Sequence, residues 1–372
     1  MTGELYIGLM SGTSVDAIDA VLLQHPAAQG AGVLGHYQLD IDSQLRGQIM
    51  ALSSREDDSL ELTLELDWKF AGLFAEATRG LLQQTGKTPG EIRAIGCHGQ
   101  TMRHCPATAQ PEEQPSYSLQ IGDANRLAEL TGIDVVADFR RRDIAAGGQA
   151  APLVPAFHAH WFGLADIRQV VVNLGGIANL TLLDGTNCVG GFDSGPANGL
   201  MNSWIFQKLG KEMDRNGEWA RGGQIAPALL DEMLADPWFS LPAPKSTGRE
   251  LFNLDWVNSK QVERLAEEDV QRTLLELTAT SLVDAIHSSA FDAQRIILCG
   301  GGCYNVALVN RIEALAGNVA VDTCSRHGIE PEQVEAAAFA WLAHQRVHQL
   351  PGNVVSVTGA KGPRVLGALY KA

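Results

Sequence analysis

The stretch LYIGLMSGTSVDAIDAVLL, Leu5 to Leu23, decides the fold of the first part of the chain. Two apolar runs flank small and hydroxyl-bearing residues between Gly8 and Ser14, a pattern that predicts two strands joined by a tight turn. Such a turn offers a phosphate group several backbone N–H groups without a Cβ in the way. An ordinary hairpin turn has the same pattern, so this stretch alone leaves both interpretations open.

Polar side chains lie in and directly after this turn. Ser11, Thr13 and Ser14 add hydroxyl donors for a phosphate. Asp16 and Asp19 follow, and their carboxylates could orient a hydrated Mg²⁺ beside that phosphate. We expect the metal ion to lie nearest Asp16.

Length and composition limit the class of protein. A chain of 372 residues is too long for one ordinary core, so we expect two domains with a cleft between them. Its 45% hydrophobic and 19% charged residues are typical of a soluble globular protein. A net charge of -15 argues against nucleic acid and anionic membranes as partners, because both need basic patches. Six scattered cysteines and no secretory leader fit reduced thiols in a cytoplasmic protein, and no apolar run approaches the roughly 18 residues of a membrane span.

The first half of the chain reads as an α/β domain. Its pattern predicts a strand over Gly32 to Ile41, a helix from about Leu60 to Gly86 and a buried strand over Ile92 to Cys97. This last strand runs into a polar loop, HGQT. Open α/β sheets place ligand groups at the carboxyl ends of strands, so His98, Gln100 and Thr101 are candidates for contacting a substrate. A strand-capping role for His98 is the alternative.

The segment RRRDIAAGGQAAPLVPAFH, Arg140 to His158, contains paired glycines and prolines, and we expect it to cross between domains without regular structure. Arg140 is a candidate site for an acidic substrate group, with solvated charge as the alternative. The expected division is an N-terminal α/β domain over 1–139, joined by the C-terminal helix and tail from about 345 to 372. A second α/β domain is then expected over 140–344.

A second hairpin repeats the pattern of the first. The apolar segments QVVVN and NLTLL flank a tight turn with Gly175 and Gly176 at its centre. Two such hairpins, each opening its own α/β domain, predict a duplicated architecture. We expect a phosphate-binding turn from each half to point into one cleft.

Two carboxylates have the character of catalytic groups. Asp193 lies where a strand gives way to a Ser-Gly-Pro turn, and backbone on both sides would position it as a general base. A turn or helix-start aspartate is the alternative. Glu335 lies near the start of an alanine-rich helix over Pro331 to Leu350, where it is either a substrate contact or a favourable partner of the helix dipole.

A glycine-rich loop follows a buried strand, Arg295 to Cys299, late in the chain. Gly300, Gly301 and Gly302 would let the backbone lie flat on a planar group such as adenine or ribose, and Asn305 ends the same loop. A P-loop is excluded because no GxxxxGK[ST] motif occurs in the chain.

These features together resemble the superfamily of sugar kinases, heat-shock chaperones and actin, whose fold is α/β: a two-domain, duplicated actin-like or hexokinase-like ATPase with a central cleft. Within it, the sequence resembles the anhydro-N-acetylmuramic acid kinase family. The motifs that carry this resemblance span nearly the whole chain and read GLMSGTSVDAID, GCHGQT, DFRRRDIAAGGQAAPLVPAFH, NLGGIANLT, GFDSGPANGLMN, PKSTGRE and VEAAAFAWLA.

The resemblance implies an ATP-dependent kinase that phosphorylates 1,6-anhydro-N-acetylmuramic acid at O6 and opens the anhydro ring with water. The product is N-acetylmuramic acid 6-phosphate, in the recycling of peptidoglycan sugar. Asp193 falls on the family's catalytic aspartate. The family's ATP-binding segment falls on Gly12, Thr13, Ser14, Val15, Asp16, Ala17, Ile18 and Asp19. The implied partners are ATP with Mg²⁺ and a small amino sugar, and a homodimer is compatible with the resemblance.

Three positions depart from the family pattern. Ala150 and Ala197 stand where glycine is usual, and Asn202 stands where an aspartate is usual. Two alternative functions remain open at this point. One is a kinase for an ordinary hexose or amino sugar, and the other is a non-catalytic sugar or nucleotide sensor of the same fold.

Overall fold

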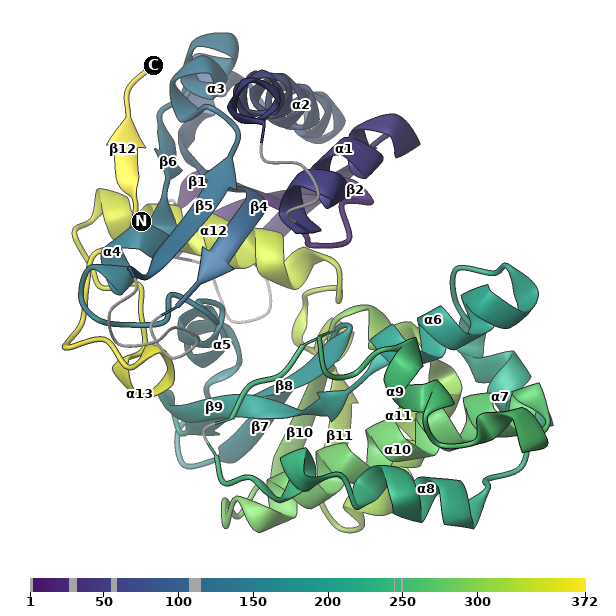
Figure 1. The fold of residues 1–372 in the computed structure, drawn as a ribbon. Helices are drawn as coiled ribbons and strands as arrows, with labels where there is room; N and C mark the ends of the chain where they lie inside the picture. Colours follow the sequence, from purple (N-terminus) through teal and green to yellow (C-terminus); the bar gives the residue numbers. More distant parts are fainter. Residues whose placement is uncertain (1–2, 27–31, 55–58, 107–114, 244, 249) are drawn as a thin grey trace. The chain divides into compact units, whose positions relative to one another are not determined.

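The computed structural model describes residues 3–26, 32–54, 59–106, 115–243, 245–248 and 250–372. The chain forms two compact units (Figure 1): unit 1 comprises Met1–Phe157 and Glu332–Ala372, and unit 2 comprises His158–Pro331. The sequence predicts domain boundaries at 139/140 and 344/345, whereas the units meet at 157/158 and 331/332. The late helix α12 (Gln333–Val347) therefore belongs to unit 1 along its whole length.

Unit 1 is built on a seven-stranded sheet with the strand order β12-β6-β4-β1-β2-β3, in which β5 pairs with β4. Its strands are β1 (Glu4–Ser11), β2 (Ala17–His25), β3 (Val33–Asp40), β4 (Ile92–Cys105), β5 (Tyr117–Ile121), β6 (Val135–Ala137) and β12 (Ala368–Tyr370). Its helices, besides α12, are α1 (Ser43–Ser54), α2 (Leu60–Thr85), α3 (Ala124–Thr131), α4 (Phe139–Ile144) and α13 (Val355–Thr358), and α5 (Pro155–Phe162) runs across the boundary.

Unit 2 is built on a five-stranded sheet with the order β11-β10-β7-β8-β9. Its strands are β7 (Arg168–Leu174), β8 (Ile177–Asp184), β9 (Asn187–Pro196), β10 (Arg295–Cys299) and β11 (Ala320–Thr323). Its helices are α6 (Asn198–Leu209), α7 (Glu218–Gly222), α8 (Pro227–Leu234), α9 (Leu254–Asn258), α10 (Glu267–Ser288) and α11 (Val306–Ala316).

The two sheets repeat one pairing pattern. In unit 1, β1, β2 and β3 are antiparallel neighbours, β4 is parallel to β1, and β6 is parallel to β4. In unit 2, β7, β8 and β9 are antiparallel neighbours, β10 is parallel to β7, and β11 is parallel to β10. The predicted α/β class and the duplicated arrangement are therefore confirmed.

Local sequence signals place the hairpins and the long helix correctly. The turn of residues 12–16 joins β1 to β2, and Gly175 and Gly176 join β7 to β8. Helix α2 begins after Ser59, whose Oγ accepts the N–H of Leu62 at 3.1 Å, and ends at Gly86 with φ at 65°. The hydroxyl cap and the left-handed glycine supply partners for the unpaired backbone groups at the helix ends.

Two expectations about irregular segments are wrong. The residues HGQT continue β4 instead of forming a loop, because Gln100 pairs with Ser11 of β1 and with Ile121 of β5. The segment 140–158 contains most of α4 and the start of α5. Its bends are held by Asp143, whose carboxylate accepts hydrogen bonds from the Ala150 N–H and from side chains of the C-terminal segment. Such partners, distant in sequence, leave no local pattern.

The core of unit 1 brings backbone against backbone. Helix α12 packs on β1, β2 and β4 (Figure 1). Gly8 and Gly96 are partners on adjacent strands. A Cβ on Gly8 would lie 1.8 Å from the carbonyl oxygen of Ala336, and a Cβ on Gly96 would lie 2.0 Å from that of Phe339. Only glycine fits beneath this helix, and the alanines that the sequence places there permit the same close approach.

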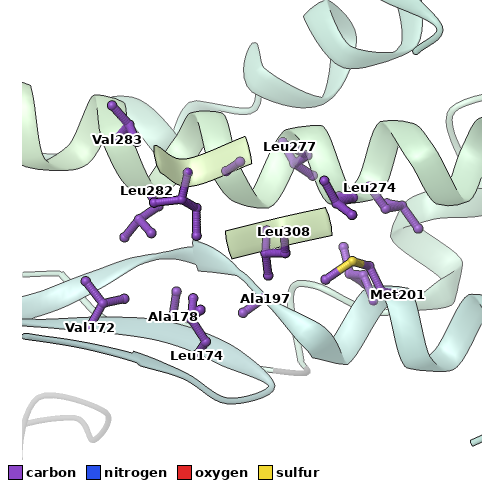
Figure 2. Packing of buried hydrophobic residues seen from close by; sticks show 14 of the residues in the cluster. Val172, Leu174, Ala178, Ala197, Met201, Leu274, Leu277, Leu282, Val283 and Leu308 are labelled. Atoms are coloured by element: carbon purple, nitrogen blue, oxygen red, sulfur yellow. The ribbon is translucent and has the colours of Figure 1, made fainter. Parts of the chain in front are cut away.

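The core of unit 2 packs side chain against side chain. Figure 2 shows the aliphatic side chains of β7, β8 and α6 meeting those of α10 and α11. The labelled members of this cluster are Val172, Leu174, Ala178, Ala197, Met201, Leu274, Leu277, Leu282, Val283 and Leu308. The cluster includes Leu174, which precedes the turn of Gly175 and Gly176, and Ala197, which precedes α6.

None of the helices in the described part of the chain combines the length and the apolar character needed to cross a membrane.

Candidate active site

The turn between β1 and β2 is closed by a hydrogen bond from the Val15 N–H to the Gly12 carbonyl at 3.2 Å. Val15 has φ at 54° and is buried, as is Ile18, so these two side chains hold the turn against the core of unit 1. Gly12, Thr13 and Ser14 lie outside the strands, with Thr13 exposed. The turn is therefore anchored by the buried side chains of Val15 and Ile18, while its hydroxyl-bearing part is accessible to solvent.

The two aspartates after the turn have side-chain partners. Asp16 forms an ion pair with Arg46 of α1 at 2.8 Å, and its side chain is 56% exposed. Asp19 lies on β2, and its Oδ1 is 2.9 Å from the Nε2 of His36 on β3. Asp16 is therefore open to solvent and able to meet a hydrated ion, while Asp19 is held within the sheet.

The candidate substrate residues of β4 and α4 are held by two sets of hydrogen bonds in unit 1. The Ser11 hydroxyl donates to Gln100 Oε1 at 2.7 Å, which links the end of β1 to β4. Thr101 Oγ1 accepts from Gln120 of β5 at 3.2 Å. Arg140 donates from Nε to His98 Nε2 at 3.0 Å and from a terminal nitrogen to the Ala150 carbonyl at 2.6 Å. The guanidinium is thereby fixed in orientation.

Burial and charge keep His98 neutral. Burial lowers the pKa of His98 well below its ordinary value, and the positive charge of Arg140 acts in the same direction. Burial also lowers the pKa of Arg140 to about 10, against an opposing effect of the Glu335 carboxylate. Arg140 stays charged at neutral pH and faces an acidic group.

Glu335, in the first turn of α12, belongs to the same electrostatic group. Desolvation raises the pKa of Glu335, Arg140 lowers it, and Asp19 raises it further. The side chain is also accessible to solvent, and water screens part of this shift. The pKa of Glu335 is therefore set by burial and by two neighbouring charges that act in opposite directions.

Ala150 adopts φ at 58°, in the left-handed region that favours glycine. Its backbone N–H donates to Asp143 Oδ2 at 2.8 Å, and its carbonyl accepts from Arg140. Ala150 therefore helps to hold the candidate substrate arginine in place.

In unit 2, the turn of Gly175 and Gly176 is tied to the start of α6. The Gly175 carbonyl accepts from the Asn198 N–H at 2.9 Å, and the Gly176 carbonyl accepts from Ala197 and Gly199 at 3.0 and 3.1 Å. A Cβ on Gly199 would lie 2.8 Å from the Gly176 oxygen. The turn and the helix N-terminus are thus held as one unit, next to the buried Ala197.

The three glycines of the late loop differ in their surroundings. A Cβ on Gly300, where φ is 78°, would lie 2.3 Å from Asn173 Oδ1, and one on Gly302 would lie 2.5 Å from Leu174 Cβ. A Cβ on Gly301 would have no atom within 4 Å. Gly300 and Gly302 therefore allow the loop to pack on β7, and Gly301 faces open space.

A cavity of about 480 Å³ lies in unit 2 beside Gly301. Its lining residues are Asn198, Asn202, Met213, Asp214, Arg215, Asn216, Gly301, Tyr304 and Asn305. Asn305 also caps α11, because its Oδ1 accepts the Leu308 N–H at 3.1 Å. The volume falls within the range of small-ligand pockets, about 300–1,000 Å³, and the lining combines amides, a glycine and an aromatic ring.

Asp193 lies within β9. The expectation of a Ser-Gly-Pro turn after it is wrong, because Ser194 to Pro196 continue β9, whose end pairs with the start of β8. The N–H of Asp193 donates to the Lys245 carbonyl at 2.9 Å, and its Oδ2 accepts the Thr247 N–H at 2.9 Å. Desolvation raises the pKa of Asp193 to about 6, the hydrogen bonds from Thr247 and Asn179 lower it, and the charge of Glu250 raises it. A carboxyl group with this pKa is ionised at neutral pH and basic enough to take a proton.

Sequence reasoning missed several neighbours of these candidates. Asn179 is the direct partner of Asp193 across β8 and β9, which hairpin register alone would have suggested. The Thr247 hydroxyl is buried without a hydrogen-bond partner among the described residues. Asp214 and Arg215 line the cavity and belong to none of the motifs that the sequence analysis selects. Within each unit the candidates come together: the β1 turn, His98 and Gln100 in unit 1, and the glycine turns and Asn305 in unit 2.

Comparison with known proteins gives one consistent answer. The family model described as "Anhydro-N-acetylmuramic acid kinase" matches residues 4–372. A protein of that name from Nitrosomonas europaea is 45% identical over 367 residues, covering 99% of both chains. The same name is carried by a Xanthomonas campestris pv. campestris protein, 46% identical over 372 residues with 99% and 97% coverage. A Pseudomonas paraeruginosa protein of that name is 45% identical with 99% coverage of both chains.

Proposed function

The chain belongs to the anhydro-N-acetylmuramic acid kinase family, and we propose that Asp193 is the catalytic base of this activity. The family membership makes the protein a phosphotransferase with an alcohol group as acceptor, with a role in peptidoglycan recycling. The observation that carries the proposal is the position of Asp193, a carboxylate held by backbone and amide partners with a pKa of about 6.

In the proposed step, ionised Asp193 takes a proton from a water molecule that attacks the anomeric carbon. The bond from that carbon to the bridging oxygen breaks, and its electron pair stays on the oxygen, which becomes O6. This oxygen forms a bond to the γ-phosphorus of ATP, and ADP leaves. The carboxylate also stabilises the positive charge that builds up at the anomeric carbon.

We propose that the adenosine part of ATP occupies the cavity beside Gly301 and Asn305, which has the size and polarity for it. Backbone N–H groups at the turn of Gly175 and Gly176 are the proposed phosphate ligands there, since their carbonyls are directed to α6. In unit 1, the N–H groups and hydroxyls from Gly12 to Ser14 have the same proposed role. Phosphoryl transfer depends mainly on such positioning and charge neutralisation.

Asp16 fits a metal ion that is bound mainly by phosphate and water. Its carboxylate is exposed and paired with Arg46, and it is not part of any three-ligand cluster among the described residues. Mg²⁺ keeps several waters and needs only one or two carboxylates beside substrate phosphates. We therefore propose that Asp16 would hold Mg²⁺, which would neutralise phosphate charge when bound.

We propose that His98, Gln100, Thr101 and Arg140 contact the sugar, with Glu335 sharing in its positioning. Arg140 is the best candidate for the substrate carboxylate, because two of its donors are already engaged and its guanidinium is oriented. Neutral His98 can donate or accept without adding charge.

The test of the catalytic base is Asp193→Asn, assayed at saturating ATP and sugar. We expect turnover to fall by a factor on the order of 10² to 10⁴. Asp184→Asn, the same substitution at an exposed end of β8, is the matched control and should keep full activity. Near-normal turnover of Asp193→Asn would overturn the assignment.

A second measurement tests the coupling of the two bond changes. The reaction is run in ¹⁸O-water, and the product is analysed by mass spectrometry. One heavy oxygen in the sugar phosphate is expected, because the attacking water becomes the anomeric hydroxyl. A sugar phosphate without heavy oxygen would show that the phosphoryl transfer proceeds without ring opening by water.

A further inference from the structure

A group of imidazole, carboxylate and phenol side chains lies where β1 begins and β2 ends in unit 1. Glu4 is the first residue of β1 and His25 the last of β2, and the two are direct partners in the hairpin register. His344 lies in the last turn of α12, and His348 directly follows the helix. None of these residues has a part in the proposed phosphoryl transfer.

The side chains of this group converge on one point. His344 and His348 are one helical turn apart and so lie on the same face. His348 Nε2 is 2.7 Å from Glu4 Oε2. Three possible ligand atoms lie within 4.8 Å of one another: a carboxylate oxygen of Glu4 and one ring nitrogen each of His344 and His348. A modest side-chain adjustment brings all three to the ligand spacing around one metal ion.

Neighbouring groups orient the carboxylate and one imidazole. The buried Tyr6 donates its hydroxyl to Glu4 Oε2 at 2.5 Å. His344 Nδ1 lies 3.1 Å from Gln345 Oε1, and since a carbonyl oxygen only accepts, Nδ1 carries the proton and Nε2 keeps its lone pair. This arrangement is the usual one around histidines that bind metals. The ring of His25 packs edge-on against His344, with centroids 4.1 Å apart.

We propose that Glu4, His344 and His348 bind a divalent transition-metal ion of the Zn²⁺ class. Two imidazoles and one carboxylate with an open fourth position are a common donor set for zinc, whereas Mg²⁺ prefers oxygen ligands. His344 offers the lone pair of its Nε2 to such an ion, since its Nδ1 carries the proton. The metal ion would tie the start of β1 to the end of α12, whose linked residues are 344 positions apart.

This site is separate from the phosphate turn. Glu4 begins β1, and the turn of residues 12–16 follows the other end of that eight-residue strand. At about 3.3 Å per residue, the two ends are roughly 25 Å apart. The kinase reaction therefore does not require metal binding at this site.

The test uses the full-length chain without a histidine tag, stripped of metal and titrated with Zn²⁺ by calorimetry and with Co²⁺ by absorption. We expect one equivalent to bind, with visible Co²⁺ bands and no thiolate charge-transfer band in the near ultraviolet. Glu4→Gln and His348→Gln should each weaken binding at least about tenfold. His287→Gln, an exposed histidine on α10, is the matched control and should bind as the wild type does.

Each other outcome overturns the proposal. These outcomes are no saturable binding, equal affinity in the wild type and both variants, or a thiolate band, which would assign the ion to cysteines. Kinase activity of the apo variants serves as the folding control and should remain at the wild-type level. In thermal melts, Zn²⁺ should raise the Tm of the wild type and of His287→Gln, and not that of His348→Gln.

Discussion

Each sheet has a pair of neighbouring residues at the same position in its central parallel strands. The pair is two glycines in unit 1 and two large aliphatic residues in unit 2. In unit 1, Gly8 lies three residues before the end of β1 and pairs with Gly96 of β4. In unit 2, Val171 lies three residues before the end of β7 and pairs with Ile297 of β10. In unit 1 the absent side chains admit the backbone of α12. In unit 2 both side chains are present and fully buried. One strand order is thus compatible with two modes of packing.

The difference teaches where each unit needs glycine. Unit 1 uses glycine beneath a helix, where stability depends on it. Unit 2 uses glycine at Gly199, Gly300 and Gly302, where the polypeptide crosses itself around the candidate nucleotide cavity. Glycine therefore serves close packing in both units, against the helix α12 in unit 1 and against β7 and the turn of Gly175 and Gly176 in unit 2.

The largest expected effect is on the packing of α12. Gly8→Ala places a methyl group 1.8 Å from the Ala336 carbonyl oxygen, so the helix must move. We expect the free energy of unfolding to fall by at least about 3 kcal/mol, measured by urea denaturation. Gly47→Ala in α1, where a Cβ meets no atom within 4 Å, is the control and should stabilise by about 0.5–1 kcal/mol. Equal unfolding midpoints for Gly8→Ala and the wild type would contradict the close packing.

The next effect separates two neighbouring glycines of unit 2. Gly302→Ala would bring a methyl group within 2.5 Å of Leu174 Cβ, and we expect a loss of about 1–3 kcal/mol in the free energy of unfolding. Gly301→Ala meets no atom within 4 Å and should leave stability unchanged. Because Gly301 lines the cavity, its variant should instead raise the KM for ATP about tenfold. An unchanged KM would remove Gly301 from the nucleotide site.

The pH dependence of kcat compares the carboxylates of the two units. Asp193 has a pKa of about 6, and only its ionised form accepts a proton, so kcat should fall about tenfold per pH unit below pH 6. The negative charge of Glu250 raises this pKa. Glu250→Gln should therefore move the acidic limb to lower pH. A limb that moves with Glu335→Gln and not with Glu250→Gln would assign the base to unit 1.

The smallest effects concern the ends of the long helices. After α2 of unit 1 comes Gly86 with φ at 65°, and after α10 of unit 2 comes Ala290, exposed, with φ at 54°. A left-handed conformation is unfavourable by about 1 kcal/mol for a residue with a Cβ. We expect Ala290→Gly to stabilise by up to about 1 kcal/mol and Gly86→Ala to destabilise by a similar amount, measured by urea denaturation. Changes of the same sign would contradict this reasoning.

Local signals in the sequence were sufficient for much of the fold. Hairpins with glycine turns, the apolar period of α2 and the proline before α12 specify these elements because their hydrogen bonds and caps lie within a few residues. The repeated hairpin also predicted the duplication, which the matching sheet orders confirm. The HGQT segment is strand and not loop because it pairs with β1, which lies far away in the chain, as well as with the next strand, β5.

In the candidate site, too, local sequence signals identify some residues, while contacts between distant segments identify others. Asp193, the glycine turns and Arg140 could be selected from residue type and motif, and their roles stay predictions. The register that sets Asn179 against Asp193, and the support of Asp193 by the segment at Thr247, depend on strands and loops meeting in space. No local pattern encodes those contacts.

The sequence by itself determined the class of fold, its duplication, the family and the residue types that the reaction needs. The tertiary structure decided that α12 lies with the first sheet, that Gly300 and Gly302 serve packing while Gly301 faces a cavity, and that desolvation raises the pKa of Asp193 to about 6. The physical reason is the distance along the chain between the residues that interact. Turns and caps are set by neighbouring residues, whereas burial, close approach and pKa depend on atoms that only folding brings together.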